Sequence, residues 1–124
     1  MRTILLDVYK NEVKEIDIAP ELDAYYKNPD CSFFDIVHLK IGGTWFDIMY
    51  DEEGLYREDH KISAVNSLEQ PMIVGNLMFF HIDEEGELTG LSEEDVSLIR
   101  SCIQIRYTRN HPEGYCMLTQ CDSR

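Results

Sequence analysis

Basic residues are scarce in this sequence. Its 124 residues include 24 Asp and Glu but only 11 Lys and Arg, which gives a formal net charge of −13. A field of that sign repels nucleic acids, acidic membranes and acidic substrates. We therefore expect no direct contact with nucleic acid or with a membrane, and a partner that is a basic protein surface or a cation.

Long apolar runs are also lacking. No apolar stretch approaches the ~20 residues that a membrane-spanning helix needs. The N-terminal segment reaches Asp7 too soon for a signal-peptide core, so we expect a cytoplasmic protein. In that compartment thiols stay reduced, and we expect no disulfide among the four cysteines, which are Cys31, Cys102, Cys116 and Cys121.

Tight pairs of metal ligands are missing as well. A structural zinc site is typically built from pairs such as Cys-x-x-Cys. Here the candidates are spread out, at Cys102, His111, Cys116 and Cys121. A calcium loop of the EF-hand type needs glycine at its sixth position, but glycine falls at the fourth position from Asp51 and from Asp83. We expect no bound metal.

Sequence signatures of catalysis are not found. The chain has no nucleophile elbow, phosphate-binding loop, dinucleotide fingerprint or metalloprotease helix. The side chains available for a nucleophile and base are Cys31, His38, His60 and His81. Two of them, His38 and His81, lie in strand-like segments beside apolar residues, so we expect half-buried structural histidines. We predict a non-enzymatic protein without cofactor or catalytic residues.

What the sequence does contain is regular alternation. Residues 2–9 and 13–18 alternate apolar and polar side chains and predict a first β-hairpin. Residues 33–41 and 44–50 do the same around Gly42-Gly43, which is typical of a two-residue hairpin turn. Residues 72–82 form the most apolar segment and predict one central strand, and residues 104–108 a last one. The aromatics Trp45, Phe46, Phe79 and Phe80 could be taken for a platform that stacks on nucleic-acid bases, but the negative field argues against it and we interpret them as core residues.

Two helices are expected between these strands. Pro20 followed by Glu21 and Asp23 favours a short helix over residues 20–27. Ser92 with Asp95 has the form of a capping box and begins an amphipathic helix that ends near Cys102. The fold class is therefore α+β, with a mainly antiparallel sheet. We expect one domain over residues 1–108 and an irregular tail over residues 109–124.

The acidic residues are concentrated in two segments. Residues 47–59 hold six acids and one base, and residues 83–95 hold seven acids and no base. Each segment contains a turn after a strand, which we name the first acidic turn (Asp51, Glu52, Glu53 and Gly54) and the second acidic turn (Asp83, Glu84, Glu85, Gly86 and Glu87). If the two strands are neighbours in an antiparallel sheet and both turns fall at one end, the carboxylates form one negative face.

Several short motifs carry a family resemblance. They are Phe34-Asp35-Ile36-Val37, Ile41-Gly42-Gly43, Phe46-Asp47-Ile48, Ile73-Val74-Gly75-Asn76-Leu77 and Leu91-Ser92-Glu93-Glu94-Asp95-Val96, together with both acidic turns. In this order and spacing they resemble the domain of unknown function 3846, over roughly residues 2–103. The resemblance implies a small protein of a bacteriophage, plasmid or conjugative element. The family has no assigned activity.

Charge and resemblance together indicate a function. We expect an accessory protein that docks on a basic, nucleic-acid-binding surface, such as a defence nuclease, and imitates nucleic acid there. The expected binding residues are Asp51, Glu52, Glu53, Asp83, Glu84, Glu85 and Glu87. Two alternatives remain open. Acidic turns also serve solubility, and a small-molecule or cation-binding regulatory domain would show a concave apolar pocket with a few polar groups.

Overall fold

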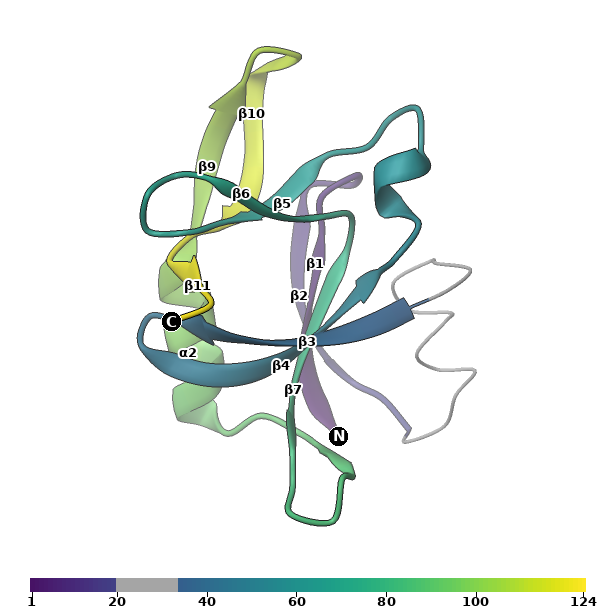
Figure 1. The fold of residues 1–124 in the computed structure, drawn as a ribbon, viewed down its shortest axis with the longest axis vertical. Helices are drawn as coiled ribbons and strands as arrows, with labels where there is room; N and C mark the ends of the chain where they lie inside the picture. Colours follow the sequence, from purple (N-terminus) through teal and green to yellow (C-terminus); the bar gives the residue numbers. More distant parts are fainter. Residues whose placement is uncertain (20–33) are drawn as a thin grey trace.

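The computed structural model describes residues 1–19 and 34–124. Within these residues the protein is mostly β, with two sheets and one α-helix towards the C-terminal end (Figure 1). The elements in chain order are β1 (Arg2–Asp7), β2 (Glu12–Asp17), β3 (Phe34–Ile41), β4 (Thr44–Asp51), the 3-10 helix η1 (Gly54–Tyr56), β5 (Ile62–Val65), β6 (Pro71–Val74), β7 (Leu77–Ile82), β8 (Leu88–Thr89), α2 (Glu93–Cys102), β9 (Ile103–Thr108), β10 (His111–Leu118) and β11 (Cys121–Asp122).

The two sheets are largely antiparallel. The large sheet has the strand order β11-β3-β4-β7-β1-β2, with β8 paired to β7. The small sheet has the order β6-β5-β10-β9, and its β5–β10 pair is parallel. The expectation of one sheet is therefore wrong. The coarser prediction, a mainly antiparallel fold with an amphipathic helix near the C-terminus, is confirmed.

The two hairpins at the start of the chain are confirmed. β1 pairs with β2 over six residue pairs, and β3 pairs with β4 over eight, around the Gly42-Gly43 turn. Both of these glycines have positive φ, as a two-residue hairpin turn requires. The helix predicted over residues 20–27 lies outside the described residues.

The apolar segment over residues 72–82 is not one strand. It divides into β6 in the small sheet and β7 in the large sheet. The break falls at Gly75, whose φ of +92° is accessible to glycine at no steric cost, and at Asn76, whose Oδ1 accepts a hydrogen bond from the Val8 amide at 3.0 Å. The chain thus crosses between sheets at these two residues, which separate two apolar runs.

Helix α2 begins as its capping box predicts. The Ser92 Oγ accepts from the Asp95 amide at 3.1 Å, and the Asp95 carboxylate accepts from the Ser92 amide at 2.9 Å. Val96, Ile99 and Cys102 form the buried side of the helix. The reciprocal cap and the apolar stripe together explain why this segment is helical within a β-rich chain.

The expectation of an irregular tail after residue 108 is wrong. Residues 111–118 form β10, which lies between β5 and β9, and Cys121–Asp122 form β11 at the edge of the large sheet. Tyr115, Met117 and Leu118 are buried in the core. β10 has an irregular pairing register between His111 and Tyr115, which interrupts the alternation of apolar and polar side chains. The sequence of this segment is therefore not periodic, although it forms a strand.

One hydrophobic core joins the two sheets and the helix. It includes Ile4 and Phe79 of the large sheet, Ile73 and Leu118 of the small sheet, and Ile99 of α2. A second cluster, with Met78 and Phe80, lies on the opposite face of the large sheet. The central strands of the large sheet are therefore buried on both faces, which leaves the turns and sheet edges as the places where function can reside.

Candidate functional site

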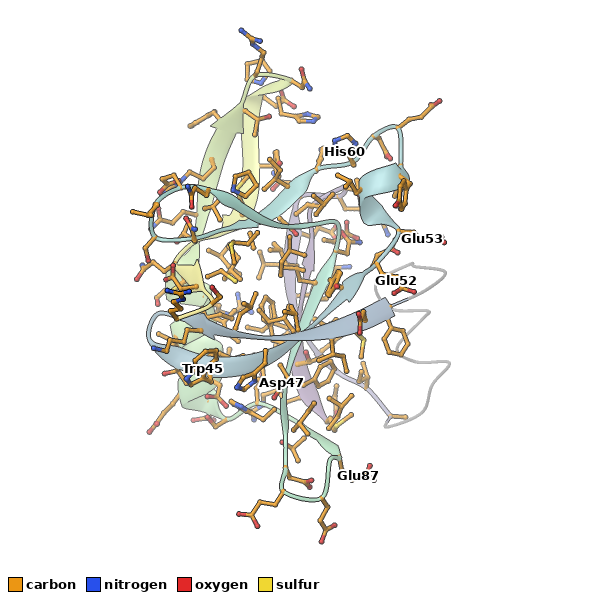
Figure 2. The ribbon with its side chains drawn as sticks, in the orientation of Figure 1. Trp45, Asp47, Glu52, Glu53, His60 and Glu87 are labelled. Carbon is orange, nitrogen blue, oxygen red and sulfur yellow. The ribbon has the colours of Figure 1, made fainter. Side chains whose placement is uncertain are left out.

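The two acidic turns lie at opposite ends of the large sheet. β4 and β7 are antiparallel neighbours, so the turns that follow them point in opposite directions. Tyr50 lies opposite Leu77, so Asp51 is level with residue 76, and Asp83 is seven residues further along. At a rise of ~3.3 Å per residue this separates the turns by about 23 Å. Figure 2 shows Glu52 and Glu53 well apart from Glu87. The single negative face that we considered is therefore not formed.

Within each turn, the aspartate and the glutamates have different surroundings. The Asp51 Oδ1 accepts from the Glu53 amide at 3.0 Å. The Asp83 Oδ1 accepts from the amides of Glu85 and Glu87, each at 2.9 Å. These two aspartates fix the turns, as Asp side chains commonly do. The glutamates of both turns are exposed to solvent.

The turn carboxylates have no cationic partner within the described parts of the chain. None of the eight ion pairs there includes any of the seven acids of the two turns. Edge strand β2 offers a contrast, because Glu12 pairs with Lys14 at 2.9 Å and Glu15 with Arg2 at 3.3 Å. Arg57, the one base within residues 47–59, is engaged by Asp59 at 3.2 Å. The carboxylates of the two turns are thus available to a cationic group of another molecule.

Helix α2 accounts for part of the second acidic segment. Glu93, Glu94 and Asp95 form its first turn, where acids favour the helix dipole. Burial opposes ionisation of Asp95, but hydrogen bonds from Ser92 and His81 outweigh it and hold the pKa of this carboxyl below its ordinary value. These three acids therefore have a structural role, whereas Glu84, Glu85 and Glu87 at the hairpin tip have none that the structure shows.

A pocket beside the first acidic turn was not foreseen from the sequence. It is a cavity of about 410 Å³ between the large sheet and β6, which we name the β4–β6 pocket. Its lining is mostly apolar and comprises Val37, Leu39, Tyr50, Asp51, Glu52, Leu55, Pro71, Met72, Ile73 and Val74. Because its walls come from both sheets, no local pattern in the sequence signals it.

Carboxylates gather at one side of this pocket. Asp51 and Glu52 belong to its lining, and Asp35 lies directly opposite Tyr50 in the β3–β4 ladder. Burial raises the pKa of the Tyr50 hydroxyl above its ordinary value, and the negative charges of Asp35 and Glu52 raise it further. The pocket therefore combines an apolar interior with a negative rim.

The histidines considered as catalytic bases have carboxylate or backbone partners. The His38 Nδ1 lies 2.8 Å from Asp47, and the His81 Nε2 lies 3.0 Å from Asp95. The His60 Nδ1 lies 3.0 Å from a backbone carbonyl. None of these rings has a serine, threonine or cysteine side chain as a partner in the part of the chain that is described, and Cys31 lies outside it.

The two histidines on strands, His38 and His81, differ in solvent exposure. The side chain of His81 is 33% exposed, as expected of a half-buried residue, but that of His38 is 60% exposed. His38 stacks on Trp45 with ring centres 4.7 Å apart, and Trp45 is itself 39% exposed. Placing Trp45 in the core was therefore wrong, because it lies near the hairpin end of β4, one residue from the start of the strand. Phe46, Phe79 and Phe80 are fully buried, as predicted.

The cysteines near the C-terminus do not lie in an irregular tail. Cys102 and Cys121 are buried, and Cys116 is half-buried on β10. Across residues 1–19 and 34–124, no group of three or more His, Cys, Asp or Glu side chains is placed to hold a metal ion. In the same residues, no helix is long and apolar enough to cross a membrane.

Comparison with protein families identifies the chain. The model of the family described as Domain of unknown function (DUF3846) matches residues 1–104. The chain belongs to the DUF3846 family. No curated protein and no solved structure matches it.

The candidate site lies within the DUF3846 match. Both acidic turns and the whole lining of the β4–β6 pocket fall between residues 1 and 104. Strands β10 and β11 follow the match, yet they complete both sheets. The pocket and turns are therefore features of the DUF3846 domain, while the last twenty residues contribute to the scaffold that holds them.

Proposed function

We propose that the protein is a non-enzymatic acidic binding protein that docks on a basic surface of another protein. The observation that carries this proposal is the set of exposed turn glutamates without a cationic partner among the described residues, namely Glu52, Glu53, Glu84, Glu85 and Glu87. Opposite charges across an interface speed association and select partners. In this proposal the protein acts in the cytoplasm, without direct contact with nucleic acid or membrane.

The proposed partner is a nucleic-acid-binding protein of a host or rival element, such as a defence nuclease. Such a protein carries a basic groove, and a phage or mobile element benefits from blocking it. The turn separation of about 23 Å corresponds to roughly seven base-pair steps of duplex DNA. Because the two turns are separate patches, each one is expected to engage its own basic region rather than to act as a continuous strand of phosphates.

Charge reversal at each turn tests the proposal. One variant combines Glu52→Lys and Glu53→Lys, and a second combines Glu84→Lys, Glu85→Lys and Glu87→Lys. Asp51 and Asp83 are left unchanged because they hold the turns. The control combines Glu15→Lys and Glu113→Lys, which changes the charge as much as the first variant but breaks only surface ion pairs of little stabilising value.

The immobilised proteins are compared by capture from host lysate at low and high salt. We expect a nucleic-acid-binding protein on the wild type and the control, lost from at least one turn variant and lost at high salt. With the purified partner, the protein should compete with DNA for binding. Capture of the same proteins by the turn variants and by the wild type would show that the acidic turns serve solubility only.

A second candidate function is favoured by the β4–β6 pocket. A small-molecule or cation-binding regulatory domain needs a concave apolar site with a few polar groups, and cavities of ~300–1,000 Å³ are the usual size for such sites. The pocket falls within that range, and Asp51 and Glu52 supply the polar groups.

A further inference from the structure

Most residues that line the β4–β6 pocket are apolar. β3 contributes Val37 and Leu39, β6 contributes Met72 and Val74, and η1 contributes Leu55, which has 61% of its surface exposed. Apart from Leu39, which is buried, these apolar side chains are partly exposed and gain free energy when an apolar group covers them. The interior thus favours an apolar body over water.

The charged residues of the lining are both acidic. Asp51 and Glu52 line the pocket, and neither carboxylate has a cationic partner in residues 1–19 and 34–124. Asp35 is placed on the same face as Tyr50 by the ladder register. An anionic ligand would be repelled at this rim, whereas a cationic head group would replace the missing partner.

The rim is held against the apolar wall by close backbone packing. Gly54 follows the acids directly, and a Cβ on it would lie 2.9 Å from the Val74 carbonyl oxygen. The first acidic turn therefore rests on β6 itself. Charge and hydrophobicity are fixed next to each other before any ligand arrives, which reduces the cost of ordering on binding.

We propose that the β4–β6 pocket is a binding site for a small molecule that has an apolar body and a cationic, amine-type head. The body lies between β3 and β6, and the head lies at the rim formed by Asp51 and Glu52. This inference goes beyond docking on a basic protein and specifies the ligand class of the second candidate function. It does not depend on whether the second acidic turn binds a partner.

Three probes that share one apolar body test this site. Phenethylamine, phenethyl alcohol and hydrocinnamate differ in carrying a positive, neutral or negative head. Each is titrated into the full chain labelled with nitrogen-15, and amide shifts are followed by NMR. We expect saturable shifts at residues of the pocket, with the amine binding about fivefold tighter than the alcohol and the acid binding weakest.

Two variants with the same charge change provide the control. Glu52→Gln should reduce the preference for the amine over the alcohol without abolishing it, because Asp51 remains at the rim, and binding of the alcohol should be unchanged. Glu87→Gln, at the opposite end of the sheet, should leave all three affinities as in the wild type. Both positions are exposed, so folding is not at risk.

Two results would overturn the inference. One is equal affinity for amine and alcohol, which would mean that the rim does not distinguish a positive from a neutral head group. The other is a pattern of shifts that does not saturate or that lies away from the pocket. Partner capture through the turn glutamates is measured without these probes, so either proposal can fail while the other stands.

Discussion

Gly54 lies against the carbonyl group of Val74, with no room for a side chain between them. A Cβ built on Gly54 would lie 2.9 Å from the Val74 oxygen and 3.7 Å from the Cα of Gly75. The contact joins the first acidic turn to β6, and so joins the two sheets at the rim of the pocket. The contact therefore joins the acidic turn, which can be recognised in the sequence, to the pocket, which cannot.

Replacing Gly54 by alanine should disturb this contact. The methyl group forces the turn away from β6, and overpacking of this kind typically costs ~1–3 kcal/mol. We expect a lower free energy of unfolding in urea and weaker amine binding in the pocket, with the net charge unchanged. The control is Glu53→Ala, which alters the neighbouring exposed residue and adds nothing against Val74. Equal stability of Gly54→Ala and the wild type would mean that the turn is free to move.

The capping box of α2 gives a second prediction. Ser92→Ala removes the hydroxyl that accepts from the Asp95 amide at 3.1 Å, and loss of such a cap costs ~1 kcal/mol. Ser97→Ala serves as the control, because Ser97 is exposed in the middle of the same helix and alanine favours helix there. Thermal unfolding should rank Ser92→Ala below the wild type and Ser97→Ala at or above it. The opposite ranking would contradict the cap.

The buried thiol of Cys121 should make the free energy of unfolding depend on pH in the alkaline range. Burial raises the pKa of its thiol from 9.0 to about 12, with smaller contributions from Asp122 and Cys102. A raised pKa means that the folded state holds the proton more tightly than the unfolded state. The resulting stability is complete below pH 9.0 and is lost as pH rises towards 12.

The loss from this one thiol reaches at most ~1.4 kcal/mol per pH unit. Urea unfolding at pH values on either side of 9.0 measures it. Burial also raises the pKa values of Tyr9, Tyr50 and Tyr115, so the wild type alone does not isolate the thiol. Cys121→Ala should therefore have a shallower pH dependence than the wild type above pH 9.0. If the free energy of unfolding falls equally with pH in both proteins, the loss of stability at alkaline pH comes from the tyrosines.

Local patterns predicted the local structure well. The alternation of β1 to β4, the Gly42-Gly43 turn and the Ser92 cap each depend on residues close together in the sequence, and the structure has all of them. In contrast, the division of residues 72–82 depends on which sheet each half joins. Gly75-Asn76 signals a break in the apolar run, because both are turn-forming residue types, but it does not signal that the two halves join different sheets.

The candidate site shows the same limit. The sequence located the acidic turns correctly, but their arrangement depends on β4 and β7 being antiparallel neighbours, which sends the turns to opposite ends. The β4–β6 pocket depends on the approach of two sheets, and its lining comes from segments as far apart as Val37 and Val74. Such relationships are set by tertiary packing and leave no periodic signal.

The C-terminal strands supply the last prediction. A chain that ends after Arg109 lacks β10 and β11, although it still contains the whole of the DUF3846 match. It would lose the strand that lies between β5 and β9, and with it the buried side chains of Tyr115, Met117 and Leu118.

Removal of a large buried side chain alone typically costs ~2–5 kcal/mol, and whole domains are stable by only ~5–15 kcal/mol. We therefore expect the shortened chain to show no cooperative thermal transition by circular dichroism. A chain shortened only by Ser123 and Arg124, which are exposed and lie after β11, should unfold like the wild type. Cooperative unfolding of the chain that ends after Arg109 would mean that the matched region folds alone, and that β10 and β11 add to a domain that is already complete.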